Sequence, residues 1–212
     1  MIEFFLGLLI GYAIGNISPS YIIARIKGFD IRKRGTGNAG ASNVAMTVGK
    51  PAALFTAVFD ILKAAAATLI VWKLFPIYSC FKILGGIGCI IGHIFPILMG
   101  FKGGKGLACL GGLLLAYDPM LFLMLLALEG VIAFYLDYIC IIPMTGSVLF
   151  LIIYTIKTGD PYGTMLLSII SLIIVIKHRQ NMLRIRCGTE PHISILWSKD
   201  KEKERISKNS RR

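Results

Sequence analysis

Three short stretches of the chain combine glycine with cationic, hydroxyl and amide side chains, the residue types that bind anions. The first reads RGTGNAGASN over residues 34–43. Glycines let successive backbone N–H groups turn toward one point and form an anion-binding concavity, to which polar side chains add donors. We expect phosphate contacts from Arg34, Gly35, Thr36, Gly37, Asn38, Gly40, Ser42 and Asn43. The alternative is a flexible turn between two helices.

The same stretch also matches the G-x-G-x-x-G pattern of dinucleotide-binding folds. A dinucleotide site requires a preceding β-strand and a βαβ unit around the glycines. A long apolar segment, typical of a membrane span, stands before these glycines instead. We therefore exclude a dinucleotide site and keep only the anion-binding interpretation.

The second stretch reads GFKGGKG over residues 100–106 and follows a GHIFP run. It resembles a P-loop, but that motif needs four residues between its glycines and a Ser or Thr after its lysine. Only three residues intervene here, and a glycine follows the lysine. No Mg²⁺ ligand is evident, so we expect a metal-free phosphate cradle built from Lys102, Gly103, Gly104, Lys105 and Gly106. Topology anchors at a membrane boundary are the alternative, although anchors do not need glycines.

The third stretch reads KHRQNMLR over residues 177–184. On a continuous helix, His178, Asn181 and Arg184 recur every three residues and share one face. His178 could act as an acid or base or donate to phosphate, and Arg179 adds a cation beside it. A juxtamembrane basic run is more often a lipid-headgroup anchor, and this stretch alone favours that alternative.

The composition places these stretches in a membrane protein. Hydrophobic residues make up 56% of the 212 residues, charged residues 16%, and the mean hydropathy is +0.74. The net charge of +12 lies in short patches between apolar runs, a distribution that argues against nucleic acid as a partner. The five cysteines are odd in number and lack metal-ligand spacing, so we expect neither a disulfide framework nor a metal site.

The apolar segments predict an all-α, polytopic transmembrane helix bundle of about seven spans. The expected spans are residues 3–24, 51–72, 80–99, 107–117, 120–136, 140–156 and 162–176. Spans four and five are the least distinct, because Asp118 and Pro119 could instead kink one longer helix. The first span lacks a signal-peptide pattern and is expected to be retained. We expect one membrane domain over residues 1–190 and a basic tail over 191–212.

The distribution of Lys and Arg predicts the orientation of the bundle. The loops after spans one and three and the tail after span seven carry most of the cations, while the opposite loops hold Lys73, Lys82 and Lys157. The positive-inside rule then puts the N-terminus outside and the C-terminus in the cytoplasm. All three glycine or basic stretches would face the cytoplasm from a cell (plasma) membrane. The tail is expected to lie on the membrane surface or to be disordered.

Ionisable residues inside the spans are costly and usually face the bundle interior. Asp60 and Lys63 lie one helical turn apart in the second span, and we expect a structural ion pair between them. Glu129, in the fifth span, has no evident partner nearby in sequence.

Together the three stretches resemble, nearly end to end, the membrane-embedded acyl-phosphate:glycerol-3-phosphate acyltransferases, the PlsY family. The matching motifs are residues 35–44 with Gly49 and Lys50, residues 92–106, and residues 178–184 with Gly188 and Glu190. Phe59, Asp60 and Lys63, in the second span, also resemble a signature of this family. The combination is specific, whereas each motif alone would be weak.

The resemblance implies transfer of a fatty acyl group from acyl phosphate to glycerol 3-phosphate, forming lysophosphatidic acid in phospholipid synthesis. It implies that Thr36, Asn38 and Lys105 hold phosphates and that His178 and Asn181 bind or orient substrate, with Thr36, Lys105, His178 and Asn181 as the catalytic set. Acyl phosphate is already activated, so neither a metal nor another cofactor is expected. Membrane lipids and an acyl-phosphate-producing enzyme are the implied partners.

Several positions depart from the family pattern. Thr36 stands where Ser is usual, Met46 where an Arg is usual, and Pro143 lies in a segment that is usually rich in Ser. Asn16 and Ala64 replace a usual Ser and Gly. The lost Arg leaves open a divergent paralogue that acts on another phosphorylated acceptor. A non-catalytic protein that binds lipid headgroups is a further alternative, and a transporter a weaker one, because no inverted repeat is visible.

Overall fold

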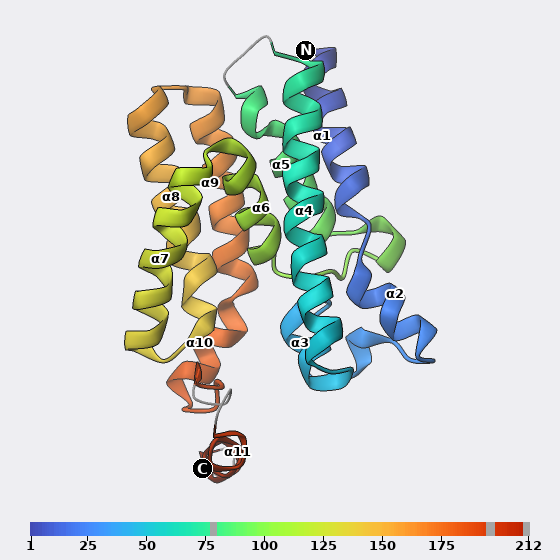
Figure 1. The fold of residues 1–212 in the computed structure, drawn as a ribbon, viewed down its shortest axis with the longest axis vertical. Helices are drawn as coiled ribbons and strands as arrows, with labels where there is room; N and C mark the ends of the chain where they lie inside the picture. The colour runs from blue at the N-terminus through green and yellow to red at the C-terminus, as the bar shows by residue number, and fades with distance from the viewer. Residues whose placement is uncertain (77–79, 194–197, 210–212) are drawn as a thin grey trace.

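The computed structural model describes residues 1–76, 80–193 and 198–209. These residues form helices and connecting turns without a strand, which confirms the expected all-α class (Figure 1). The α-helices are α1 (Ile2–Gly15), α2 (Pro19–Ile26), α3 (Ala41–Thr47), α4 (Lys50–Leu74), α5 (Phe81–Ile94), α6 (Leu107–Tyr117), α7 (Pro119–Leu136), α8 (Ile142–Thr158), α9 (Pro161–Lys177), α10 (Arg179–Arg186) and α11 (Lys199–Asn209). Three short 3₁₀ turns are η1 (Ile31–Lys33), η2 (Ile97–Met99) and η3 (Ile139–Ile141).

Each of the seven expected spans corresponds to a helical segment, but the segments differ in their capacity to cross a bilayer. Five are long and apolar enough within the described chain: Ile2–Ile26, Lys50–Leu74, Phe81–Met99, Pro119–Leu136 and Ile139–Thr158. A sixth forms if α9 and α10, which meet at a bend of 43°, count as one span. The remaining segment, α6, has 11 residues and is shorter than a full crossing requires. The count of seven spans therefore stays a prediction.

Two helix boundaries depend on proline and a capping side chain. The first expected span is interrupted between α1 and α2, because Pro19 has no N–H to continue the helical ladder. Asp118 separates α6 from α7, where its side chain accepts a hydrogen bond from Leu121 N at 3.1 Å. Pro119 follows as the first residue of α7. Spans four and five are thus two helices rather than one kinked helix.

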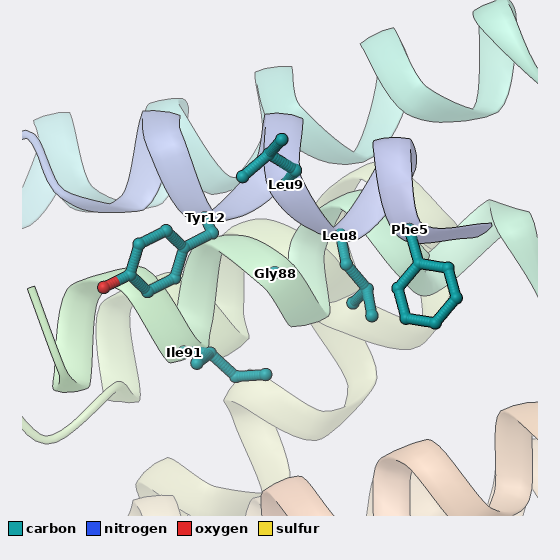
Figure 2. A pocket seen from close by; sticks show the side chains of 6 residues that line it. All are labelled: Phe5, Leu8, Leu9, Tyr12, Gly88 and Ile91. Carbon is teal, nitrogen blue, oxygen red and sulfur yellow. The ribbon is translucent and has the colours of Figure 1, made fainter. Parts of the chain in front are cut away.

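Helices α1 and α5 pack through glycines that allow their backbones to touch. A Cβ on Gly11 would lie 2.2 Å from the carbonyl oxygen of Gly85, and one on Gly88 would lie 2.4 Å from that of Leu8. The hydrophobic effect contributes little to the association of helices in lipid. Small residues at such contacts instead stabilise the helix pair through close van der Waals packing. The outer edge of this contact forms an apolar groove of about 280 Å³, and Tyr12 and Ile91 border it (Figure 2).

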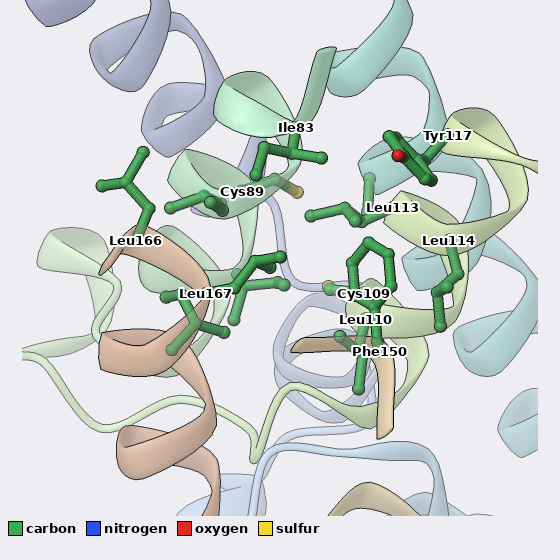
Figure 3. Packing of buried hydrophobic residues seen from close by; sticks show 14 of the residues in the cluster. Ile83, Cys89, Cys109, Leu110, Leu113, Leu114, Tyr117, Phe150, Leu166 and Leu167 are labelled. Carbon is green, nitrogen blue, oxygen red and sulfur yellow. The ribbon is translucent and has the colours of Figure 1, made fainter. Parts of the chain in front are cut away.

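The remaining core joins α5 and α6 to α8 and α9. Figure 3 shows Ile83, Leu113, Phe150 and Leu167 converging from these four helices, and all four side chains are buried. Large apolar side chains on the outer faces are exposed, especially on α4 and α7, as a hydrocarbon solvent requires. In Figure 1 short α6 lies between a group formed by α1, α4 and α5 and a group formed by α7, α8 and α9.

The elements that carry the first and third motif stretches lie toward one end of the bundle. Figure 1 shows α2, α3 and α10 at the end opposite the N-terminus, with α11 beyond α10. The green segment between α5 and α6, which contains residues 100–106, lies nearer the middle of the molecule. The N-terminus and α11 lie at opposite ends of the described chain, and which end faces the cytoplasm stays a prediction.

Candidate functional site

The glycine loop of residues 34–43 is shaped from beneath by Asn43. This residue is fully buried, and its amide oxygen accepts a hydrogen bond from Thr36 N at 2.9 Å. Its amide nitrogen donates to the carbonyl oxygens of Ile31 and Arg34, both at 3.0 Å. Gly35 and Gly37 have positive φ angles of 58° and 72°, which glycine adopts without strain. In this structure Asn43 is committed to the loop backbone and leaves Thr36 at the surface.

The polar groups of this loop divide into an exposed set and a half-buried set. Arg34, Gly35, Thr36 and Ser42 are exposed. Gly37, Asn38 and Gly40 are half-buried, and Asn38 N lies 3.4 Å from Thr36 Oγ1. Thr36 and Asn38 therefore lie close together, and neither is buried.

A hydrogen bond from Arg32 and a small apolar cluster attach this loop to the next motif. Arg32 pairs with Asp30 at 2.6 Å and donates to the carbonyl oxygen of Met99, in the turn that leads into residues 100–106. Met99 is also buried against Ile31 and Ala39 of the first loop. The Arg32 guanidinium holds the pKa of the Asp30 carboxyl well below its usual range. The first two predicted stretches are thus neighbours in the fold.

The loop of residues 100–106 folds tightly over the end of α5. Gly103 N donates to Ile94 O at 3.2 Å, and Gly104 N donates to His93 O at 3.0 Å. A Cβ on Gly103 would lie 2.0 Å from the carbonyl oxygen of His93, and a Cβ on Gly104 would lie 2.1 Å from its Nε2. Both glycines are therefore required by close approach. Gly106 has a φ of +91°, which favours glycine as well.

His93 belongs to a buried polar network below this loop. The Lys63 ammonium lies 2.7 Å from Asp60 Oδ1, which confirms the expected ion pair. Lys63 also donates to Ile17 O at 2.6 Å and lies 3.2 Å from His93 Nδ1. Asp60, His93 and Cys109 bring possible metal ligands within 4.8 Å of one another. The Lys63 cation already neutralises this cluster, so we assign no metal there.

The third stretch bends at His178, so the condition for one shared helical face, a continuous helix, is not met. The backbone N–H of His178 closes α9, and α10 departs at 43°. His178 Nδ1 lies 2.8 Å from the carbonyl oxygen of Ile174, which can only accept, so Nδ1 carries a hydrogen. His178 and Asn181 are both buried, while Arg179 is exposed. His178 Nε2 remains available to accept from, or donate to, a ligand.

Lys105 and Asn181 join the second and third stretches directly. The Lys105 ammonium donates to the amide oxygen of Asn181. Asn181 Nδ2 in turn donates to Glu190 Oε1 at 2.5 Å, and Arg184 Nε donates to Glu190 Oε2 at 2.6 Å. Burial lowers the pKa of Lys105, and the nearby Arg184 cation lowers it further, while Glu190 opposes both. Lys102, by contrast, is exposed.

Glu190 and His93 contact the predicted site residues, although their sequence positions alone gave them no site role. Glu190 is 6% exposed and holds both Asn181 and Arg184, so it orients the third stretch from outside its helix. In the sequence, only the position of Glu190 just after Gly188 indicated this role. The partner of Glu129 was also missed: Thr145 Oγ1 donates to Glu129 Oε2 at 2.6 Å across α7 and α8.

Fold and site together define an integral-membrane helical protein with adjoining glycine and lysine loops suited to phosphate groups. A family model described as "Glycerol-3-phosphate acyltransferase" matches residues 5–188. The glycerol-3-phosphate acyltransferase of Bacillus velezensis is 36% identical over 188 residues, which is 88% of this chain and 95% of that protein. That of Bacillus subtilis is 32% identical over 190 residues, covering 89% and 97%. The chain therefore belongs to the glycerol-3-phosphate acyltransferase family.

Solved structures show the same fold. The crystal structure of PlsY, an integral membrane glycerol 3-phosphate acyltransferase, in its glycerol 3-phosphate form has a TM-score of 0.82 and 28% identity. The match covers 91% of this chain and 96% of that one. Its lysophosphatidic acid form has a TM-score of 0.79 at the same identity and coverage. The family and the membrane-embedded helical class inferred from the sequence are both confirmed.

Proposed function

We propose that this chain transfers a fatty acyl group from acyl phosphate to the 1-hydroxyl of glycerol 3-phosphate, yielding lysophosphatidic acid and inorganic phosphate. The observation that carries the proposal is the Lys105–Asn181 hydrogen bond. It joins a partly buried cation of the glycine loop of residues 100–106 to α10, which begins directly after His178. The relatives at 32–36% identity are named for the same acyltransferase activity.

The proposed reaction needs positioning and charge stabilisation rather than a protein nucleophile. The hydroxyl oxygen of glycerol 3-phosphate attacks the acyl carbon, and the bond from that carbon to the phosphate oxygen breaks. The leaving phosphate keeps the electron pair, and one of its oxygens accepts the hydroxyl proton. Donors fixed before the reaction stabilise the developing charge without reorganising, which is where much of the rate enhancement in such sites arises.

Named residues have distinct roles in this proposal. Lys105 neutralises a phosphate, and Thr36 and Asn38 offer donors from the adjoining loop. His178 Nε2 orients a substrate hydroxyl or phosphate, because its Nδ1 is committed to Ile174 O. Asn181 keeps the Lys105 ammonium in place. Arg34, Ser42, Lys102 and Arg179 are exposed and would act as an outer ring that attracts anions.

The location of the reaction follows from charge distribution and substrate chemistry. Cations gather in the loop after α2, the loop of residues 100–106 and the segment after α9. We infer that these segments face the cytoplasm from the cell membrane, by the positive-inside rule. The acyl chain of the donor would enter from the bilayer, and an enzyme that makes acyl phosphate would supply it. Residues 1–190 would form the catalytic domain, with residues 191–212 as a cytoplasmic extension.

A second candidate function is acyl transfer to a different phosphorylated acceptor. Met46, where an Arg is usual in the family, is 55% exposed on α3, directly after the glycine loop. An uncharged side chain there removes one cation from the phosphate-binding surface. The enzyme would then distinguish glycerol 3-phosphate less strongly from a smaller or less charged phosphate ester.

Phosphate release from purified protein tests the proposal. The protein in lipid vesicles is supplied with palmitoyl phosphate and glycerol 3-phosphate, and inorganic phosphate is measured over time. We expect release that requires the acceptor and is lost in Lys105→Ala but kept in Lys73→Ala, a cation at the far end of α4. Equal release from Lys105→Ala and the unaltered protein would overturn the proposal. Release with another phosphate ester alone would support the second candidate.

A further inference from the structure

The C-terminal helix α11 is attached to the turn that ends α10. Two guanidinium nitrogens of Arg205 donate to the carbonyl oxygens of Gly188 at 2.6 Å and Glu190 at 2.7 Å. Asn209 Nδ2 also donates to Gly188 O, at 2.9 Å. The backbone of residues 188–190 is thereby held by side chains that lie 15 to 21 residues further along the chain.

This turn is the one that aims the Glu190 carboxylate inward. Gly188 adopts a φ of +65°, and the N–H groups of Thr189 and Glu190 donate to Arg184 O at 2.8 and 3.1 Å. The backbone of the turn is therefore fixed from one side by α10 and from the other by Arg205. The Glu190 side chain continues inward to Asn181, which holds Lys105.

A second set of contacts holds His192, which follows the turn, against α11 and against the corner between α7 and η3. Glu202 pairs with Arg205 at 2.6 Å and accepts a hydrogen bond from His192 N at 2.8 Å. The His192 ring lies 3.2 Å from Asp137 and 3.1 Å from the hydroxyl of Tyr138. Glu202, a buried carboxylate, thus joins α11 to the corner between α7 and η3.

We propose that α11 is a positioning element for the active site, in which Arg205 fixes residues 188–190 so that Glu190 keeps Asn181 and Lys105 aligned for phosphate. This inference rests on the proposed function, because it concerns the same lysine. The family match ends at Gly188, so α11 lies beyond the region that defines the family. A basic tail that composition assigns to the membrane surface would then have an internal role.

Steady-state kinetics of Arg205→Ala test the positioning role. We expect the KM for glycerol 3-phosphate to rise about three- to tenfold, a range typical of coupled neighbours, while Lys208→Ala leaves it unchanged. Lys208 is an exposed cation of the same helix and so matches the loss of charge. Arg205→Lys, which can reach one carbonyl but not both, is expected to recover part of the loss.

A double-variant cycle and a pH profile separate positioning from general destabilisation. In a Glu190→Gln background, Arg205→Ala is expected to add no further rise in KM, because the connection is already broken. The groups facing Lys105 are Arg184, Glu190, His178 and Cys140. Loosening Glu190 removes the group that raises the pKa of Lys105, so the alkaline limb of activity moves to lower pH in Arg205→Ala.

A nitroxide on Cys187 reports the contact without any turnover. Cys187 is exposed, whereas the other four cysteines are buried, so labelling is selective. We expect a more mobile spectrum in Arg205→Ala than in Lys208→Ala. Equal spectra, or kinetics of Arg205→Ala equal to those of Lys208→Ala, overturn the positioning role while leaving the acyltransferase activity intact. Absence of phosphate release in the unaltered protein overturns the proposed function and this inference with it.

Discussion

The Lys105 ammonium donates a hydrogen bond to the amide oxygen of Asn181, although the two residues are 76 positions apart in the chain. This contact brings the glycine and lysine loop after α5 against the turn between α9 and α10. Asn181 is itself held by Glu190 at 2.5 Å. A cation held this way retains a fixed position while its remaining protons stay available to a phosphate.

The first prediction concerns Asn181. In Asn181→Ala the Lys105 ammonium loses its anchor, and we expect kcat/KM for glycerol 3-phosphate to fall about ten- to hundredfold, as for loss of a charged hydrogen bond worth about 1.5–3 kcal/mol. Gln180→Ala is the matched control, because it removes an exposed amide from the same helix. Similar losses in both variants would show that Asn181 has no special role.

The second prediction concerns the cation missing at Met46. Met46→Arg restores a guanidinium beside the glycine loop and is expected to raise kcat/KM for glycerol 3-phosphate about tenfold, mainly through KM. Met46→Gln has similar length without charge and should have no such effect. An unchanged or slower Met46→Arg enzyme would indicate that another residue has taken the role, or that the acceptor differs.

The third prediction is a pH dependence set by Lys105. Its pKa is lowered from the ordinary 10.5 by burial and by Arg184, whereas a bound phosphate raises it again. Binding is therefore strongest while Lys105 is protonated and weakens as pH rises through the lowered pKa of the free enzyme. We expect an alkaline limb in kcat/KM below pH 10.5, which moves upward in Lys105→Arg because guanidinium stays charged. If the alkaline limb lies at the same pH in the unaltered protein and in Lys105→Arg, the limb belongs to another group.

The fourth prediction concerns the α1–α5 contact. Gly88→Ala places a Cβ 2.4 Å from Leu8 O and is expected to destabilise the protein by about 1–3 kcal/mol, the usual range for overpacking. In Gly130→Ala the new Cβ would have no neighbour within 4 Å from other parts of the described chain, so the change is expected to be neutral or to stabilise α7 by up to about 1 kcal/mol. Thermal unfolding in detergent measures both. Equal melting temperatures would mean that α1 and α5 can separate without penalty.

The fifth prediction is that chelators do not change the acyltransferase activity. A glycine follows Lys105 where a P-loop has its Mg²⁺-binding hydroxyl, and Lys63 supplies the cation between Asp60 and His93. Phosphate release should therefore be the same in EDTA and in added Mg²⁺. A strong dependence on Mg²⁺ would require a metal-bound form of the substrate.

Local features of the fold were predictable from sequence, because they depend on spacing along one helix. Asp60 and Lys63 are three residues apart, and their ion pair followed from helical geometry alone. The break at Asp118 could be anticipated for a similar reason, since Pro119 begins a helix more readily than it continues one. The motif stretches themselves were visible as runs of glycine and lysine.

Long-range pairing and local bends were not predictable in the same way. The bend at His178 depends on its bonds to Ile174 and on what α10 packs against, so the sequence left open whether the helix continues there. Composition described the tail as charged, but the partners of Arg205 lie on a turn whose shape only the folded chain defines. The inward role of Asn43 was hidden because its position beside Ser42 looked equally suited to a ligand.

The most direct measurement follows the acyl group itself. Radiolabelled palmitoyl phosphate is incubated with the protein in vesicles, with and without glycerol 3-phosphate, and the lipid products are separated. We predict that the label appears in lysophosphatidic acid only when glycerol 3-phosphate is present, and that Lys105→Ala abolishes this transfer. An active preparation of a related acyltransferase serves as the reference. If the label stays in palmitoyl phosphate, or appears only as free palmitate, the proposed acyl transfer is contradicted.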